Sequence, residues 1–349
     1  MNEKKIILLV DDDKSNLVIA QKLLADEYRV AAVNSGAMAL RFLEKNKPDV
    51  ILLDILMPEM DGFEVMKRIQ ENPELKSIPV IFLTADRSAK TEEDCFRMGA
   101  VDFIGKPFVP GIMLQRVHRT VELEEYRKSL EKIVQQQLQR ITQLQSDIII
   151  TMANLIESRD GTTGEHVKRT SVYTHFLVGK MLEKGVYAEE LTPKFVDYLC
   201  KAAPMHDIGK ITVPDRILSK PGALTPEEYD MMKNHAAEGG KIIRDNMDRI
   251  ADKEFVDIAF DMATYHHEKW NGMGYPSGKA GLDIPLSARI LAVVDVFDAL
   301  VSKRQYKEGM TLEQAFDIMR RDRGVAFEDK IWDVFEESAD ELREIMKEL

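Results

Sequence analysis

The sequence predicts a multidomain protein, with a doubly wound α/β domain over residues 1–121, a helical linker over 122–150 and an all-α bundle over 151–349. Three observations support this division. Short apolar runs alternate with amphipathic stretches in the first part, the second part contains neither Gly nor Pro, and the third part lacks an alternating strand pattern. A chain of 349 residues is also longer than one ordinary domain.

The first segment has the pattern of a parallel sheet. Continuous β-rich runs occupy residues 6–10, 50–55 and 80–84, and turn residues bound each of them. Strands that are buried on both faces have this composition. Amphipathic helices are expected over residues 16–27 and 37–46, so that strands and helices alternate as they do in doubly wound folds.

The linker has the periodicity of a long helix with one apolar face. Its apolar side chains recur in steps of three and four residues, as in the a and d positions of a coiled coil, which favours a parallel homodimer. Arg127 and Gln137 interrupt the pattern, so a single connecting helix stays the alternative. One position of the repeat holds Leu123, Leu130, Gln137 and Leu144, and the other holds Val134, Ile141 and Ile148.

The third segment reads as helices throughout. A clear helix start lies at Thr225, because Thr can cap a helix whose first residue is Pro226, and Glu228 completes a capping box. The segment is therefore expected to form an all-α bundle, a different fold class from the first segment.

Composition and charge exclude several classes of partner. A net charge of −12 disfavours DNA and anionic membranes, because both attract basic surfaces. Cys95 and Cys200 cannot build a disulfide framework, which fits a reducing compartment. Acids directly follow the apolar N-terminal run, which is expected to form a strand and not a signal peptide. No apolar stretch approaches the ~18 residues of a membrane span, so the expected location is cytoplasmic.

Polar side chains gather where the predicted strands end. Asp11 and Asp12 follow the first strand, Asp54 and Thr84 end two others, and Lys106 follows the short apolar piece VDFIG. The carboxyl ends of parallel strands meet at one edge of the sheet, where such folds bind their ligands. Three carboxylates at this edge would repel one another unless a hard cation such as Mg²⁺ lay among them.

Four motifs carry a family resemblance in this segment. VDDDKSN, LLDILMPEMDG, FLTA and GKPF resemble the receiver domain of bacterial response regulators, which has a flavodoxin-like fold. The resemblance implies that a sensor histidine kinase phosphorylates Asp54, whose carboxylate is the nucleophile. It also implies that Asp11 and Asp12 bind Mg²⁺ together with Asp54, that Thr84 and Lys106 contact the phosphoryl oxygens, and that Phe103 is the switch aromatic.

Five of the seven histidines lie in the third segment beside other site-like residues. One histidine is usually structural, but several histidines with two aspartates in one helical domain have the composition of a binuclear metal site. The adjacent pair His266-His267 at a helix end could reach one ion from two directions. The whole set consists of His166, His206, His235, His266 and His267 with Asp207 and Asp295.

The motifs of residues 150–330 resemble the HD-GYP subfamily of HD phosphohydrolases. The match runs through HDIGK, ITVPDRILSKPGALTPEE, HHEKWNGMGYP, IPLSARILAVVDVFDAL and SKRQYK. The resemblance implies a metal-dependent phosphodiesterase that hydrolyses cyclic di-GMP to linear pGpG and, in some members, on to GMP. It also implies iron or manganese as the two divalent ions, which suits mixed nitrogen and oxygen ligands.

The resemblance assigns a role to each residue of the set. A hydroxide that bridges the two ions would attack the phosphodiester, because two cations lower the pKa of bound water. Lys210 would neutralise phosphate charge or protonate the leaving oxygen, and Asp160 could share that proton transfer. Arg304 and Lys307 would hold the other phosphate. One ion would be bound by His166, His206, Asp207 and Asp295, and the second by Asp207, His235, His266 and His267.

The sequence departs from the family pattern at Thr162, where some members carry a glutamate that binds a third metal. A hydroxyl is a poor substitute, so two ions are expected. Gly274, Tyr275 and Pro276 form either a shaped surface loop or a docking surface for diguanylate cyclase (GGDEF) domains.

The leading hypothesis is a cyclic di-GMP phosphodiesterase that phosphorylation of the receiver domain controls through the helical linker. One alternative is a non-catalytic module that senses a cyclic dinucleotide or docks cyclases. Another keeps the chemistry and changes the substrate to cyclic GMP-AMP or pGpG.

Overall fold

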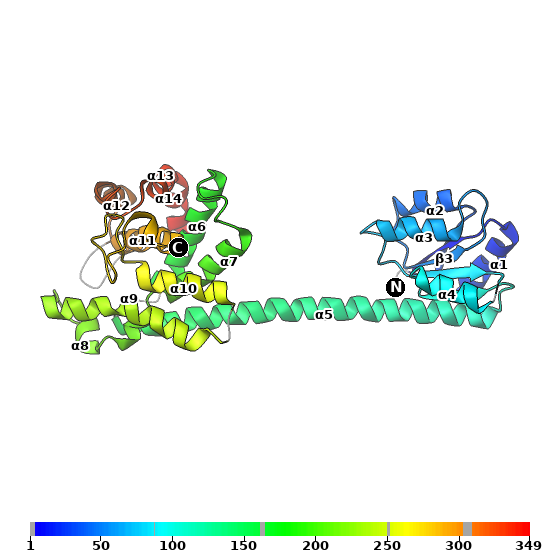
Figure 1. Ribbon diagram of the computed structural model, residues 1–349, viewed down its shortest axis with the longest axis horizontal. Helices are drawn as coiled ribbons and strands as arrows, with labels where there is room; N and C mark the ends of the chain where they lie inside the picture. The colour runs from blue at the N-terminus through cyan, green and yellow to red at the C-terminus, as the bar shows by residue number, and fades with distance from the viewer. Residues whose placement is uncertain (1–3, 87, 161–164, 250–251, 303–308) are drawn as a thin grey trace. The chain divides into compact units, whose positions relative to one another are not determined.

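The computed structural model describes residues 4–86, 88–160, 165–249, 252–302 and 309–349. It confirms the predicted fold class, with a parallel five-stranded sheet in the first part of the chain and helices in the rest (Figure 1). The chain separates into two units, Met1–Gln139 and Arg140–Leu349. One helix, α5 (Pro110–Glu157), runs through the predicted boundaries at residues 121 and 150, which stay predictions.

The sheet of the first unit has the order β2-β1-β3-β4-β5, and every pairing is parallel. Its strands are β1 (Ile6–Val10), β2 (Arg29–Val33), β3 (Val50–Asp54), β4 (Val80–Thr84) and β5 (Asp102–Gly105). The helices between them are α1 (Lys14–Leu24), α2 (Gly36–Leu43), α3 (Gly62–Glu71) and α4 (Ala89–Arg97). The predicted strands at 6–10 and 80–84 are confirmed, and the one at 50–55 ends a residue earlier.

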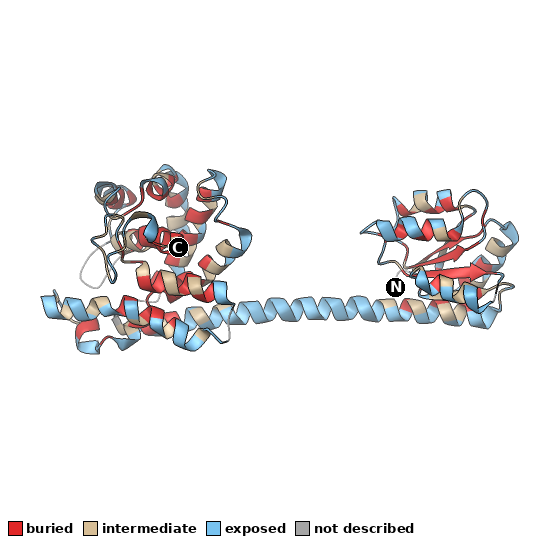
Figure 2. Ribbon diagram, viewed as in Figure 1, coloured by how far each residue is buried: buried red, intermediate tan, exposed pale blue. Residues whose placement is uncertain are grey.

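Alternate residues of the central strands face two separate cores. Leu8 and Val10 pack in a cluster with side chains of α2 and α3, whereas Ile7 and Leu9 pack in another with side chains of α1 and the first turns of α5. Both faces of β1, β3 and β4 are therefore covered, which explains their continuous apolar sequence (Figure 2). This sandwich leaves the carboxyl ends of the strands for function.

Helix α5 joins the last helix expected for the receiver domain to the predicted linker in 48 continuous residues. Residues 112–160 contain neither Gly nor Pro, so nothing in the sequence interrupts the helix. The predicted a and d residues are exposed along it, from Leu123 (58%) to Ile148 (58%). The coiled-coil dimer stays a prediction.

The second unit consists of α-helices and short 3₁₀ helices around the largest hydrophobic cluster of the protein. Among its described residues, the only β-type pairing is an isolated bridge between Arg323 and Phe327. The α-helices after α5 are α6 (Glu165–Glu183), α7 (Pro193–Ala202), α8 (Asp215–Leu218), α9 (Pro226–Met247), α10 (Lys253–Tyr265), α11 (Leu286–Val301), α12 (Leu312–Met319), α13 (Asp329–Glu337) and α14 (Ala339–Glu348). The 3₁₀ helices are η1 (Ser158–Asp160), η2 (Ala203–Met205), η3 (Ile208–Thr212), η4 (Gly281–Asp283) and η5 (Arg320–Asp322).

Aromatic packing anchors α11 in this unit. The ring of Phe297 lies 5.2 Å from that of Tyr173 and 5.1 Å from that of Phe335, in edge-to-face arrangements. Phe297 and Tyr173 are almost fully buried. Because Asp295 and Asp298 are carried by the same helix, the core fixes where these two carboxylates lie.

Helix α9 begins as the sequence predicts and packs closely on both sides. Thr225 and Glu228 form the predicted capping box. A Cβ atom on Gly209 would lie 1.9 Å from the carbonyl oxygen of His235, and one on Gly240 would lie 2.0 Å from Oγ1 of Thr264. These glycines let α9 approach η3 on one side and α10 on the other. Within the described ranges, no helix has both the length and the apolar content needed to cross a bilayer.

Candidate metal centres

Three carboxylates meet at the carboxyl edge of the sheet in the first unit. Potential ligand atoms of Asp11, Asp12 and Asp54 lie within 4.8 Å of one another. Asp11 and Asp54 are buried, and Nζ of Lys106 lies 2.7 Å from a carboxylate oxygen of each. Burial raises the pKa of Asp54, although Lys106 opposes this effect. Oxygen ligands and surplus negative charge are what Mg²⁺ requires, so the residues fit this ion.

The other predicted receiver residues lie at the ends of the neighbouring strands. Thr84 ends β4 and is buried, and its hydroxyl donates a hydrogen bond to the carbonyl of Asp86 at 2.9 Å. In the β4–β5 register it lies opposite Gly105, the residue before Lys106. Phe103 lies in β5, half-buried, with its ring edge-to-face with Phe96 at 5.9 Å. The structure therefore brings Thr84 and Lys106 to the same edge of the sheet as the acids.

In the second unit, the predicted ligands come from five places in the chain. His206 and Asp207 lie in a turn between η2 and η3, and not inside a helix. His235 is carried by α9, and the pair His266-His267 directly follows α10. His166 is in the first turn of α6, and Asp295 is in α11. All are buried or half-buried.

Backbone carbonyls fix the tautomer of three of the histidines. Nδ1 of His206 lies 2.8 Å from the carbonyl of Ala203, and Nδ1 of His235 lies 2.7 Å from that of Met232. Nδ1 of His266 lies 2.9 Å from the carbonyl of Met262. A carbonyl only accepts hydrogen bonds, so Nδ1 carries the proton in each ring. The lone pair of each neutral ring is therefore on Nε2.

These lone pairs converge on Asp207. Its Oδ1 atom lies 3.3 Å from Nε2 of His235 and 3.7 Å from Nε2 of His266. All three atoms are buried, and no hydrogen-bond partner for them exists in the part of the chain that the structure describes. Such electron-rich atoms repel one another unless a cation lies between them. With a ligand atom of His267 within 4.8 Å, they fit a divalent ion.

A second group of ligand atoms shares Asp207. His166 and His206 face each other with their Nε2 atoms 3.4 Å apart, and Oδ2 of Asp207 lies 3.4 Å from Nε2 of His206. Oδ1 of Asp295 lies 3.6 Å from Nε2 of His166 and 3.8 Å from Nε2 of His206. The two oxygens of Asp207 thus point to two adjoining ligand groups, which is the arrangement that a bridging carboxylate requires.

The electrostatics of the two groups differ. Burial lowers the pKa of His266 to about 4 and that of His267 well below its usual value, so both rings are neutral at pH 7. Burial also lowers the pKa of His206, but the carboxylates of Asp207 and Asp295 outweigh it and raise the pKa to about 9. The group that contains His206 therefore attracts positive charge, which a proton or a divalent cation can supply.

Lys210 lies beside the shared carboxylate. Its Nζ atom is 2.7 Å from Oδ2 of Asp207, three residues earlier in the chain. Burial alone would raise the pKa of Asp207, but Lys210 and His206 hold it well below the usual value. The carboxylate is therefore ionised, as a metal ligand must be.

Three residues beside these ligands were not predicted from the sequence. Asp298 accepts a hydrogen bond from Nδ1 of His166 at 2.7 Å, and Arg169 binds the same carboxylate. The spacing of three residues between Asp295 and Asp298 puts both on one helix face, a signal that could have identified Asp298. Glu157 is buried near His166, and an acid at the end of the apolar run ANLIE is only a weak signal.

Four residues of interest lie outside the described atoms. Arg304, Lys307 and Thr162 fall in undescribed ranges, and so does the side chain of Asp160, whose backbone ends η1. The structure describes the loop after His267, and a hydrogen bond joins its two ends. Glu268 is buried and accepts a hydrogen bond from the Ser277 amide at 2.7 Å.

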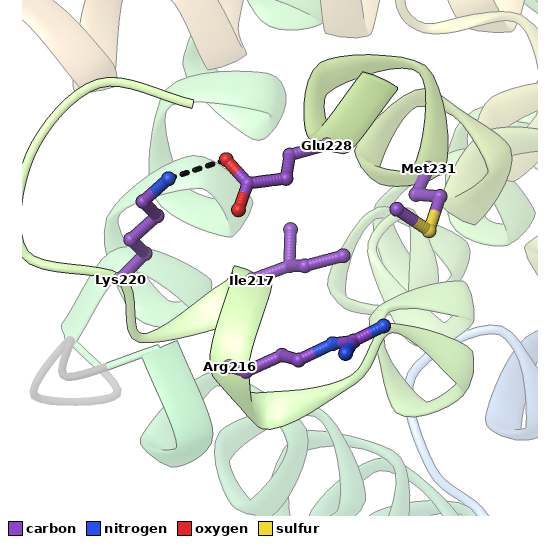
Figure 3. Close-up of a pocket in the computed structure, with 5 residues that line it drawn as sticks. All are labelled: Arg216, Ile217, Lys220, Glu228 and Met231. Atoms are coloured by element: carbon purple, nitrogen blue, oxygen red, sulfur yellow. Dashed lines mark hydrogen bonds and ion pairs between the residues drawn. The ribbon is translucent and has the colours of Figure 1, made fainter. Parts of the chain in front are cut away.

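The same unit contains a pocket of about 340 Å³ lined by Arg216, Ile217, Lys220, Glu228 and Met231 (Figure 3). The Nζ atom of Lys220 lies 2.5 Å from Oε2 of Glu228, which also accepts a hydrogen bond from the amide of Thr225. These contacts anchor the start of α9, the helix that carries His235. None of the lining residues is a predicted site residue.

Two family models match the chain. The model described as the response regulator receiver domain matches residues 7–119, and the model described as the HD domain matches residues 128–331. The first covers the sheet and its carboxylates. The second covers every candidate metal ligand of the helical unit.

Two curated relatives match almost the whole chain, and a third matches about half of it. A probable cyclic di-GMP phosphodiesterase of Vibrio cholerae is 40% identical over 94% of this chain and 76% of its own length. The cyclic di-GMP phosphodiesterase response regulator RpfG of Xanthomonas campestris is 33% identical over 97% of this chain and 89% of its own. A 3'3'-cGAMP-specific phosphodiesterase 2 of Vibrio cholerae is 37% identical over 56% of this chain and 35% of its own.

Proposed function

This chain belongs to the family of response regulators in which an HD domain follows a receiver domain, and we propose that it hydrolyses cyclic di-GMP to linear pGpG under control of Asp54 phosphorylation. One observation carries the chemical part of the proposal. The two oxygens of Asp207 face two adjoining groups of histidine nitrogens, as a binuclear hydrolytic centre requires. The names of the two long relatives support the substrate.

The proposed metal ligands follow from this geometry. One ion would be bound by His166, His206, Asp207 and Asp295, and the other by Asp207, His235, His266 and His267. Imidazole with carboxylate suits iron or manganese, and the acids of the receiver suit Mg²⁺. Bound divalent ions would supply the acidity that converts water to hydroxide and the positive charge that screens the phosphate.

The protein's own residues would bind and orient the substrate. Lys210 is held beside Asp207, where its ammonium group can neutralise a phosphate oxygen or donate a proton to the departing sugar oxygen. We assign the second phosphate to Arg304 and Lys307, and a share in the proton transfer to Asp160. In the absence of a carboxylate at position 162, hydrolysis is expected to stop mainly at pGpG.

The proposal for regulation rests on helix α5. A sensor histidine kinase would phosphorylate Asp54, and α5 would carry the signal. The helix contributes its own buried side chains to both units, Met113 and Val117 to the sheet unit and Ala153 and Ile156 to the helical unit. We propose a homodimer that pairs the exposed apolar residues of α5. Near its end these residues line an apolar groove of about 740 Å³ with side chains that include Met205 and Ile208. The loop at Tyr275 is a candidate contact for GGDEF domains.

The experiment that tests the function is a hydrolysis assay on the full chain loaded with Mn²⁺ or Fe²⁺. Wild type should convert cyclic di-GMP to pGpG, and Asp207→Ala should abolish turnover because both ligand groups lose a member. Asp230→Ala, whose side chain is 71% exposed, is the matched control. If the metal-loaded wild type leaves cyclic di-GMP intact, the enzymatic proposal is wrong, and nucleotide binding without turnover would favour the sensor alternative.

A second candidate substrate is cyclic GMP-AMP, which the name of a relative that matches 56% of this chain favours. The metal chemistry would be the same, since both substrates contain the same phosphodiester. Competition between cyclic di-GMP, cyclic GMP-AMP and pGpG in one assay would rank them by kcat/KM.

A further inference from the structure

A buried carboxylate reaches the metal centre from an unexpected element. Glu157 is the last residue of α5, and its side chain is almost fully buried. Its Oε1 atom lies 3.9 Å from Nε2 of His166 and 3.4 Å from Nζ of Lys210. No motif of the sequence singled out this residue, and the proposed mechanism does not use it.

The tautomer of His166 makes this approach chemically specific. Nδ1 of the ring donates to the carboxylate of Asp298, which Arg169 also holds in its ionised form. The lone pair of the neutral ring is therefore on Nε2 and faces two carboxylate oxygens, Oε1 of Glu157 and Oδ1 of Asp295 at 3.6 Å. Ligand atoms that share one ion at bonds of about 2.1 Å lie within about 4.2 Å of each other. Both distances meet this limit.

The position of Glu157 is fixed by its neighbours. Ile156 is buried beside it, and two residues later Arg159 donates hydrogen bonds to the carbonyls of Lys210, Ile211 and Val213 at 3.1–3.2 Å. Arg159 also pairs with Asp215 at 2.6 Å. The end of α5 is thus bound to the segment that carries the HD motif, which holds the carboxylate in place at the ion site.

We propose that Glu157 is a further metal ligand, which binds the ion shared by His166, His206 and Asp295. This inference rests on the proposed binuclear function and adds a residue to it. Oxygen ligands raise the negative charge around the ion, and iron and manganese accept five or six mixed ligands. The ligand would also give α5 a direct bond to the ion, so that a change in the helix alters the metal centre without an intermediate element.

Metal binding by the full-length protein tests this proposal without the need for turnover. Mn²⁺ titration, followed by the electron paramagnetic resonance signal of free Mn²⁺ and by metal analysis after dialysis, should find two tight ions per helical unit in wild type. Glu157→Gln keeps the size of the side chain and removes its charge. We expect its affinity for one ion to fall about 10–100-fold while the other ion stays bound.

The matched control is Glu183→Gln, at the opposite end of α6 from His166, since the Glu183 side chain is 65% exposed and pairs with Lys180. It should bind both ions as wild type does. If the Gln variant does not fold, Glu157→Asp replaces it in the Mn²⁺ titration. This variant moves the carboxylate away from the ion by one methylene and should also lower the affinity for one ion. Two ions bound at wild-type affinity by either Glu157 variant would overturn the proposal, even if KM changed through Lys210. A wild type that binds two ions but does not hydrolyse cyclic di-GMP would refute the proposed function only.

Discussion

Nδ1 of His166 lies 2.7 Å from Oδ2 of Asp298, a contact that joins residues 132 positions apart in the sequence. The carboxylate determines which nitrogen of the ring carries the proton and directs the other nitrogen toward His206. Asp298 therefore orients a proposed metal ligand from outside the proposed ligand set, and its replacement should change metal affinity before it changes the fold.

Asp298→Asn tests this control. The amide can still accept the hydrogen bond, but it no longer supports positive charge on the imidazole, and Arg169 loses its ionised partner. Affinity for one ion should fall about 10–100-fold, as measured by isothermal titration with Mn²⁺. Asp317→Asn, on a side chain that is 66% exposed, serves as the control. Equal affinity in the two variants would contradict this account of Asp298.

Gly209→Ala should damage the metal centre by a steric route. The added methyl would lie 1.9 Å from the carbonyl of His235 and 2.5 Å from the amide of Gly239, so η3 must move away from α9. We expect a lower Tm and fewer bound ions. Gly179→Ala, in α6 with nothing within 4 Å of the new Cβ, should instead stabilise the protein by ~0.5–1 kcal/mol. Thermal unfolding and metal analysis of both variants give the comparison, and an unchanged ion content in Gly209→Ala would refute it.

Asp54→Asn should abolish phosphorylation of the first unit. Its carboxylate is buried 2.7 Å from Nζ of Lys106, and the amide that replaces it is not a nucleophile. Incubation with acetyl phosphate and Mg²⁺, followed by a phosphate-affinity gel, should give a shifted band for wild type and none for the variant. The exposed Asp26→Asn should behave as wild type. A shifted band in the Asp54 variant would mean that another residue accepts the phosphate.

Asp261 should make stability depend on pH. Burial, with a contribution from Asp257, raises the pKa of this carboxyl to about 6. The unfolded chain loses the proton near its ordinary pKa, so folding stability falls as pH rises from about 4 to 6 and stays reduced above 6. Asp261→Asn removes this cost, on the order of 1 kcal/mol after solvent screening, or ~2–4 °C in Tm.

Calorimetry of the metal-free protein at two pH values checks the sign of this effect. The variant should melt above wild type at pH 8 and match it near pH 4. The exposed Asp245→Asn should follow wild type at both. A variant that gains as much at pH 4 as at pH 8 would show that the carboxyl is not the cause.

The fold could be predicted from the sequence where a segment is buried on both faces or where a local motif marks the start of a helix. The central strands are apolar on both faces, which predicts a covered parallel sheet. Thr225, Pro226 and Glu228 form a local motif that marks the start of α9. The length of α5 is harder to predict. The absence of Gly and Pro after Gly111 shows that a helix can continue, but it does not mark the point where one domain ends and the next begins.

The candidate site shows the same distinction. The predicted ligands of the helical unit occur in motifs, and the structure brings them together. Asp298 and Glu157 are ordinary acids in the sequence, and only the packing of α11 and the end of α5 gives them a role. The turn that holds His206 and Asp207 could not be anticipated from helical periodicity, since Gly209 permits it through a contact with α9.

Three of the histidines donate their orienting hydrogen bond to a carbonyl three or four residues upstream, whereas His166 donates to a distant aspartate. For protein design, this makes most of the centre portable. His206, His235 and His266 could be transplanted to another helical scaffold with their own short segments and would keep the correct tautomer. The His166–Asp298 pair, by contrast, would have to be rebuilt as a tertiary contact.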